Sequence, residues 1–367
     1  MDQSACENKT GNVSRIPIAN IWHMLLYAWN EVPLRHYVNV EVDRSPSLDA
    51  LLASILAALI QQRIRVGLGR SYVDENRLLR GIRGRIDFVE SVKRTSFDFG
   101  QAYCRFQTFK TDAPKNQIVR SILMYLVQTG EFGPDKATAE KLRQRLRRIV
   151  RTLDDVELIE VTSSVIRRQH LGRNDDDYRL MLSICDLVLQ RQMPTEQAGA
   201  KHLPGLDRDL VTLYRIYERF VANFYRIHLR KWRVLMQHPL QWHSTKHSEF
   251  LPTMVVDLLL SDPDKSRTIV LDTKFTASSL IQGRSEKLVF DSSHLYQMYA
   301  YLRSQEQVSA EFQNACGIIL YPTVRWQLSE QIELQGHLVG IETVNLALPW
   351  GEIEARLLEL VHNYNAN

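Results

Sequence analysis

Apolar residues recur every three or four positions through much of the first half of the chain. This spacing predicts amphipathic helices, because such residues share one face of a helix. The predicted helices cover residues 19–29, 47–66, 117–128, 135–153 and 178–192. Residues 78–89 instead alternate apolar and polar side chains around two glycines, and residues 103–109 also alternate, which predicts strands with tight turns. The first half is therefore expected to be mostly helical with a small β element.

The second half mixes helical and strand patterns. Two short apolar runs, residues 254–260 and 267–275, flank a polar turn and predict paired strands. The other predicted elements are helices over residues 206–232, 293–303 and 350–364, and strands over residues 316–321 and 339–346. This order is typical of a compact α/β domain. The expected fold class of the whole chain is therefore α/β (α+β).

The length of the chain and a segment rich in proline and glycine predict its division into domains. The 367 residues exceed one ordinary core, which predicts two domains. Residues 193–205 hold two prolines and two glycines among polar residues, and they are the expected linker. The predicted domains are therefore residues 1–200 and 206–367. Residues 1–13 are polar and are expected to be disordered.

Composition narrows the class of protein. A formal net charge of +4 permits a polyanionic partner without requiring one. No P-loop motif is present, so the chain is expected to bind no nucleotide of its own. The apolar segment 48–60 is shorter than the ~20 residues of a membrane span, so no membrane contact is expected. Four widely spaced cysteines, without CxxC spacing, predict a reduced cytoplasmic protein without structural zinc: Cys6, Cys104, Cys185 and Cys316.

The two apolar runs carry the candidate chemistry. Asp257 interrupts the first run, and Asp272 and Lys274 stand two residues apart at the end of the second. Strand side chains alternate faces, so Asp272 and Lys274 share one surface, and Asp257 reaches it if the runs pair. The spacing D-x14-D-x-K is typical of a metal-dependent phosphodiesterase.

Each of these residue types has a part in that chemistry. Mg²⁺ takes one or two carboxylates, which predicts Asp257 and Asp272 as metal ligands. Lys274 is predicted to orient or deprotonate a water, or to hold the phosphate. The alternative is a structural ion pair between Asp257 and Lys274.

Two helices add candidate residues. Gln297 and Tyr301 lie four apart on one face of the predicted helix 293–303, where Gln297 can reach the phosphate or the lysine and Tyr301 can support it. Glu218, on the helix before the first strand, is a candidate third carboxylate. The alternatives are a surface role for Gln297 and, for Glu218, a salt bridge to Arg215 or Arg219.

Arginines mark two further segments. The predicted helix 135–153 is rich in arginine, which is typical either of phosphate contact or of the solvated face of a core helix. Arg80, Arg83 and Arg85 lie in the glycine-marked β element and are candidates for binding a partner, with a solvated hairpin as the alternative.

Taken together, these segments resemble a known family. Asp257, Asp272, Lys274 and the Gln297-x-x-x-Tyr301 helix are similar to the core of the PD-(D/E)xK nuclease fold, in its RecB-like branch. Six blocks in the same order resemble McrC, the cleavage subunit of McrBC-type restriction systems: 16–30, 81–88, 106–123, 216–229, 295–302 and 320–322. One position differs from the PD-(D/E)xK motif. Val256 directly precedes Asp257, where the motif has a proline.

The resemblance implies a function. It implies a Mg²⁺-dependent endonuclease of a 5-methylcytosine restriction system, with Mn²⁺ as a substitute ion and double-stranded DNA as substrate. The partner would be a McrB-like AAA+ GTPase ring, which would recognise the methyl mark and activate the endonuclease. The N-terminal half of this chain would dock on that ring and stimulate its GTPase. Two alternatives remain open, a non-cleaving activator of that GTPase and a stand-alone DNA repair nuclease.

Overall fold

The computed structural model describes residues 16–32, 45–172, 175–191, 205–242, 248–264, 267–275, 280–282, 288–325 and 327–364. The chain forms two compact units. Residues 1–37 and 198–367 make one, here called the sheet unit, and residues 38–197 make the other, the helical unit. The segment 1–13, predicted to be disordered, and nearly all of the predicted linker lie outside the described residues.

A mixed six-stranded sheet forms the centre of the sheet unit, in the order β10-β11-β9-β6-β5-β4. β6 and β11 each run parallel to β9, and the other neighbours are antiparallel. The strands are β4 (Arg233–Leu240), β5 (Met254–Ser261), β6 (Thr268–Thr273), β9 (Cys316–Thr323), β10 (Ser329–Leu334) and β11 (His337–Asn345). A separate small ladder pairs β7 (Leu280–Gln282) with β8 (Leu288–Phe290).

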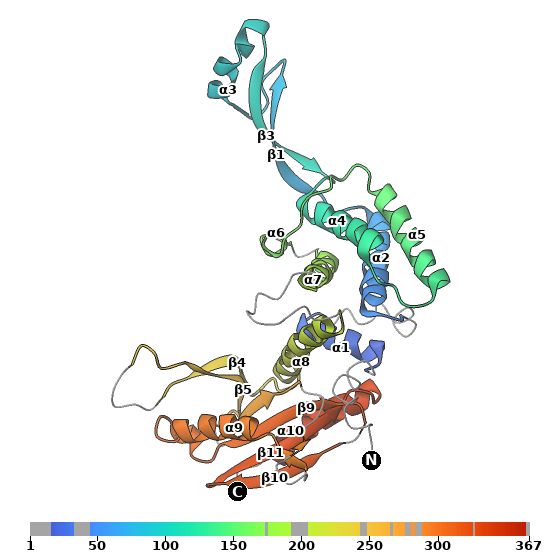
Figure 1. Ribbon diagram of the computed structural model, residues 1–367. Helices are drawn as coiled ribbons and strands as arrows, with labels where there is room; N and C mark the ends of the chain where they lie inside the picture. The colour runs from blue at the N-terminus through green and yellow to red at the C-terminus, as the bar shows by residue number, and fades with distance from the viewer. Residues whose placement is uncertain are drawn as a thin grey trace. The chain divides into compact units, whose positions relative to one another are not determined.

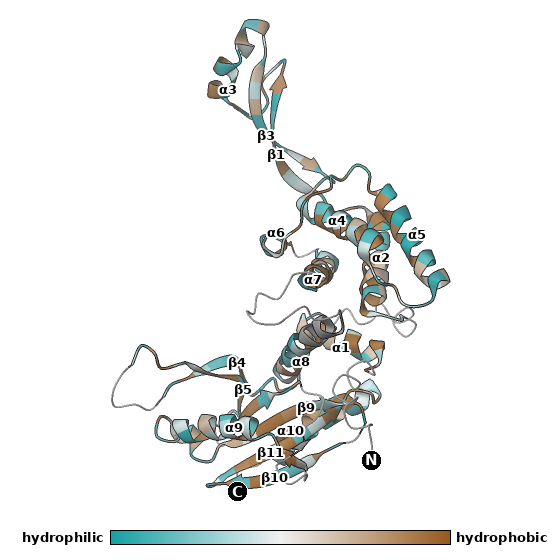
Figure 2. Ribbon diagram, viewed as in Figure 1, coloured by the Kyte–Doolittle hydropathy of each residue, from teal (hydrophilic) through white to brown (hydrophobic). Residues whose placement is uncertain are grey.

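The central strands are apolar, as Figure 2 shows for β9. Every residue of β6 is buried, and so are the first six residues of β9. Strands buried on both faces carry continuous apolar runs instead of alternation. Burial on both faces therefore explains why the segment 316–321 forms a strand without a period of two.

Helices complete the sheet unit. α9 (Ser292–Gln305) packs on one face of the sheet, where Met298 and Leu302 join a core cluster with Val270 and Ile319. The remaining helices are α1 (Ile18–Ala28), α8 (Gly205–His228), α10 (Trp350–Asn363) and the short η6 (Ala310–Phe312). The Tyr225 hydroxyl of α8 donates to the Leu357 carbonyl of α10 at 2.8 Å. α8 is thereby fixed to the C-terminal helix.

The first helix belongs to the sheet unit, which corrects the predicted division at residue 200. α1 lies beside α8 (Figure 1). The Asn20 amide donates to the Leu346 and Leu348 carbonyls at 2.8 and 2.9 Å, and the Asn223 amide donates to the Tyr27 carbonyl. Asn20 is therefore a buried link to the C-terminal part of the chain and does not cap its helix, which begins after Pro17.

The helical unit combines a helix cluster with a long hairpin (Figure 1). Its helices are α2 (Leu48–Val66), α3 (Phe88–Lys93), α4 (Pro114–Thr129), α5 (Lys136–Thr152), α6 (Ser163–Arg167) and α7 (Asp176–Gln190), with η5 (Ser96–Phe99). β1 (Ser71–Leu79) and β3 (Ala102–Lys110) pair antiparallel along their whole length, and β2 (Arg85–Ile86) pairs with β3. The strand predicted at residues 103–109 is confirmed by β3, whereas the predicted segment 78–89 contains only the last two residues of β1, the short β2 and the first two residues of α3.

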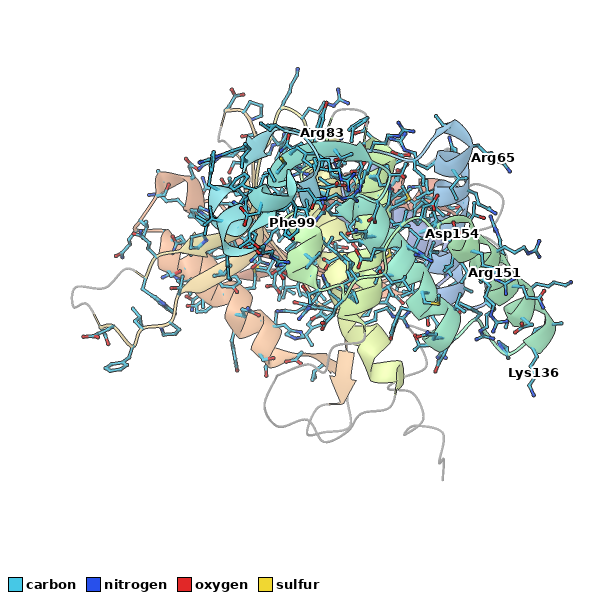
Figure 3. All side chains as sticks on the ribbon, turned by 90° about the horizontal axis from the view of Figure 1, so that it is seen from above. Arg65, Arg83, Phe99, Lys136, Arg151 and Asp154 are labelled. Carbon is cyan, nitrogen blue, oxygen red and sulfur yellow. The ribbon has the colours of Figure 1, made fainter. Side chains whose placement is uncertain are left out.

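The arginine-rich helix uses part of its charge internally. Leu146, Ile149 and Val150 of α5 are buried, as the predicted core helix requires. Arg143 donates to two backbone carbonyls, and Arg145 donates to Gln61. The side chains of Lys136 and Arg151 extend outward from the helix (Figure 3).

In the part of the chain that the structure describes, no helix combines the length and hydropathy of a membrane span.

Candidate active site

The two candidate aspartates lie next to one end of the β5–β6 ladder. The two runs pair as predicted, with Leu258 opposite Leu271. Asp257 and Asp272 are the next residues on the two strands beyond this pair. Asp257 accepts from Thr273, the neighbour of Asp272, and its charge acts on the carboxyl group of Asp272. The structure therefore brings both carboxylates together at the end of the ladder.

Asp272 is the more buried carboxylate, with 4% of its surface exposed. Burial, followed by repulsion from Asp257, raises the pKa of Asp272 to about 6, although Lys274 acts in the opposite sense. The Lys274 ammonium lies 2.7 Å from Asp272 Oδ2. The ion pair at this site thus joins Lys274 to Asp272, whereas the alternative considered from the sequence paired Lys274 with Asp257.

A chain of hydrogen bonds connects the lysine to α9. Lys274 Nζ donates to Gln297 Oε1 at 2.6 Å, and Gln297 Nε2 donates to the Tyr301 hydroxyl at 2.6 Å. Tyr301 in turn donates to the Val255 carbonyl of β5 at 2.8 Å. The four-residue spacing on α9 thus aims both side chains at the sheet, with Gln297 placed on the lysine.

Asp257 is held by neutral donors. Its Oδ2 accepts from the backbone N–H and the hydroxyl of Thr273, both at 2.8 Å. Its Oδ1 accepts from Gln237 Nε2 at 3.2 Å. These donors fix the orientation of the carboxylate without neutralising it.

Glu218 approaches the pair from α8. Gln237 also donates to Glu218 Oε1, so one amide links Glu218 to Asp257. Burial, and then the charge of Asp257, raises the pKa of Glu218. Among the described residues, no group of three or more histidine, cysteine or acidic side chains is arranged to hold a metal ion, and Glu218 is connected to Asp257 through Gln237.

Two further residues belong to this site that the sequence did not single out. Tyr214 stands one helical turn before Glu218, and burial followed by the charges of Asp257 and Glu218 raises its pKa to about 12. Its spacing of four from Glu218 is a signal that was available in the sequence. Gln237 lies on β4, a strand that was not predicted, and no pattern in the sequence indicated that this residue belongs to the site.

The donor set fits a hard divalent cation. Burial is the main cause of the raised pKa of Asp272, and repulsion from Asp257 adds to it; a bound cation would offset both effects. Mg²⁺ binds through one or two carboxylates and keeps its other positions for water and phosphate. Asp257 and Asp272 supply two carboxylates, which is the number of protein ligands that this preference calls for.

The three candidate partner-binding arginines lie in the helical unit, and all three are exposed. The Arg83 guanidinium stands 4.4 Å from the centre of the Phe106 ring, and Arg85 pairs with Arg105 in the β2–β3 ladder. Arg80 lies in the turn that follows β1. The three arginines thus surround the turn between the first two strands of the hairpin.

The mixed sheet and the carboxylate–lysine face define an α/β protein with a nuclease-like domain. The family described as McrBC 5-methylcytosine restriction system component matches residues 6–322. The chain belongs to this family, and the resemblance predicted from its sequence blocks is confirmed.

Two comparisons illustrate the relationship. The type IV methyl-directed restriction enzyme EcoKMcrBC of Escherichia coli (strain K12) is 25% identical over 353 residues, covering 95% of this chain and 98% of the relative. A solved structure shares the fold with a TM-score of 0.56 at 14% identity, over 95% of this chain and 76% of that chain. It is described as a refined half-complex from a tetradecameric assembly of Thermococcus gammatolerans McrB AAA+ hexamers with bound McrC.

Proposed function

We propose that this chain is the DNA-cleaving subunit of a 5-methylcytosine-dependent restriction system, a Mg²⁺-dependent endonuclease that works with an AAA+ GTPase. The observation that carries the proposal is that Asp257, Asp272, Lys274 and Gln297 lie together at the end of the β5–β6 ladder, where Lys274 contacts Asp272 and Gln297 and the charge of Asp257 acts on Asp272. Two carboxylates beside a hydrogen-bonded lysine have the charges and donors that phosphodiester hydrolysis needs.

The aspartates would hold the cation. Asp257 is oriented by Thr273 and Gln237, and Asp272 is fixed by its contact with Lys274. The ion, when bound, supplies positive charge to the phosphate and lowers the pKa of an attacking water. The remaining requirements, which are orientation and proton transfer, fall to the side chains of this chain.

Lys274 is suited to contact the phosphate or the water. An ammonium has three protons to donate, and Asp272 and Gln297 accept two of them. The third can be donated to an oxygen of the substrate. Because Tyr301 anchors Gln297 to β5, the direction of the ammonium is fixed by the fold.

A partner ring accounts for the helical unit, which carries none of these groups. The hairpin end around α3 and η5 exposes apolar side chains, including Val89 at 79% and Phe99 at 75%. Figure 3 labels Phe99 together with Arg83, which comes from the same hairpin. Exposed apolar groups gathered on one element are typical of a protein-binding surface. We therefore assign this end to the GTPase, which would recognise methylated cytosine.

One reaction series tests the proposal. Purified chain is incubated with methylated or unmethylated duplex DNA, with Mg²⁺ or EDTA, and with or without its GTPase partner and GTP. The proposal expects cleavage only when methylated DNA, Mg²⁺ and the partner are all present. Cleavage without the partner would indicate a stand-alone nuclease, and GTPase stimulation without cleavage would indicate a non-cleaving activator.

An enzyme that cuts incoming DNA is expected to act in the cytoplasm.

A further inference from the structure

Gln237 has an unusual backbone conformation at the edge of the candidate site. Its φ is +45°, in the left-handed region that non-glycine residues rarely adopt. The β4–β5 ladder is regular on both sides, with Met236 opposite Leu258 and His238 opposite Val256. Gln237 thus interrupts the strand at the position that faces Asp257.

The side chain makes use of this conformation. Gln237 Nε2 donates to Glu218 Oε1 and to Asp257 Oδ1, so one amide spans α8 and β5. The Gln237 side chain is exposed, so its unusual backbone conformation is not explained by packing in the core. Strained residues persist where the surrounding structure determines them, and they are concentrated at functional sites.

The chemistry of the bridge favours an amide. A lysine or arginine at this position would place a positive charge beside two carboxylates and compete with a bound cation. A glutamine donates two hydrogen bonds and leaves the negative charge of both acids intact. It therefore orients Glu218 and Asp257 while preserving their attraction for a metal ion.

We infer that Gln237 is a positioning residue, which holds the Glu218 and Asp257 carboxylates in one arrangement for a divalent cation. This inference rests on the proposed function, because it presupposes a cation at the aspartate pair. It adds that the site extends to α8 and depends on a side chain of the edge strand.

Glycine at this position separates positioning from a purely structural role. Gln237→Gly removes both hydrogen bonds, yet glycine adopts a φ of +45° without strain. We expect the melting temperature to stay the same or rise, and the Kd for Mn²⁺ to weaken about tenfold or more, as for other residues that orient metal ligands. Mn²⁺ binding to the full chain is followed by electron paramagnetic resonance of the free ion, without reference to cleavage.

The chain offers a matched control. Gln335, between β10 and β11, also has a left-handed φ, of +49°. Gln335→Gly makes the same chemical change in the same unit and is expected to leave the Mn²⁺ affinity unchanged. A second variant, Gln237→Asn, tolerates the left-handed conformation but is one methylene shorter, so it is expected to weaken Mn²⁺ binding as well.

The outcomes are distinct. If Gln237→Gly and Gln237→Asn bind Mn²⁺ as the wild type does, Gln237 does not position the carboxylates and the inference is overturned. A lower melting temperature with unchanged affinity would also overturn it, because the role of Gln237 would then be structural. If the wild type binds no Mn²⁺, and Asp257→Asn changes nothing, the proposed function loses its cation and the inference falls with it.

Discussion

The Lys274 ammonium, one residue beyond the end of β6, lies 2.7 Å from Oδ2 of Asp272 in that strand. Asp257 accepts hydrogen bonds from the neutral donors Gln237 and Thr273, so one positive group lies beside two negative ones. Because Asp272 is buried, its charge is sensitive to every change at its neighbours. Several consequences of that arrangement are measurable.

Stability should depend on pH through Asp272. Its pKa is raised from 3.8 to about 6 in the folded chain, so the folded state binds more protons than the unfolded state between these values. The free energy of unfolding therefore falls as pH rises from about 4 to 6. Asp272→Asn lacks this penalty, and its stability relative to wild type should improve by about 3 kcal/mol at most between pH 4 and 7.

Urea unfolding in EDTA at pH 4.5 and pH 7 measures this effect without a metal ion. The variant also loses the ion pair with Lys274, which lowers its stability and sets the size of the net difference. The change of that difference with pH is the diagnostic quantity. If the free energies of unfolding of variant and wild type differ by the same amount at both pH values, the pKa of Asp272 is not raised in the folded chain.

Replacing Gln297 should impair cleavage by releasing the lysine. Gln297→Leu removes the acceptor at 2.6 Å from Lys274 Nζ and the donor to Tyr301. We expect the cleavage rate to fall about tenfold to a hundredfold, the usual range when a residue that orients a catalytic group is removed. Tyr296→Phe, on the same helix but 72% exposed, is the control and should cleave normally. A normal rate for Gln297→Leu would remove this residue from the site.

The stability of the helical unit should depend on the buried Tyr178. The Tyr178 hydroxyl accepts from the Gly69 backbone N–H at 2.9 Å and donates to Asn116, and the Asn116 amide donates to the carbonyls of Gly69 and Thr111. This network ties both ends of the β1–β3 hairpin to α4 and α7. Tyr178→Phe leaves buried groups unpaired and should destabilise the unit by about 1–3 kcal/mol.

Tyr72→Phe is a suitable comparison for Tyr178→Phe, because the Tyr72 side chain is 69% exposed. Its unfolding midpoint in urea should match the wild type. Equal midpoints for both variants would mean that the hydrogen bonds of Tyr178 contribute nothing to stability.

The exposed hairpin end should be needed for the partner. Val89→Ser with Phe99→Ser removes apolar surface that is already exposed, so folding should be preserved. We expect stimulation of the partner's GTPase to fall by tenfold or more, while Mn²⁺ binding stays normal. Val66→Ser, 76% exposed at the end of α2, controls for the loss of surface hydrophobicity. Full stimulation by the double variant would place the docking surface elsewhere.

Arg83 is tested separately, because it is exposed but stacks on Phe106. If Arg83 reaches an acidic group or a nucleotide of the ring, Arg83→Ala lowers the partner's GTPase rate. An unchanged rate would leave the stacking contact as the role of this arginine.

The sequence allowed part of the site to be predicted because strand geometry is local. A period of two places Asp272 and Lys274 on one face, and the short polar turn pairs their strand with that of Asp257. A spacing of four similarly aims Gln297 and Tyr301 in one direction. These relationships involve neighbours in the chain or a single turn, so no long-range contact had to be known.

Other features depend on contacts between distant segments. β4 contains Pro239 and exposed polar residues and shows no alternation, so neither the strand nor Gln237 could be recognised. β10 is a largely exposed edge strand with few apolar residues. The position of α1 depends on the bonds of Asn20 to carbonyls more than three hundred residues away, which no local pattern encodes.

The central claim is that this chain cuts DNA with the aspartates and the lysine of one sheet face. Asp257→Asn and Lys274→Ala test it most directly, in reactions with the partner GTPase, GTP, Mg²⁺ and methylated DNA. We expect both variants to lose cleavage by a thousandfold or more while they stimulate the GTPase as the wild type does. Cleavage at the wild-type rate by either variant would contradict the account.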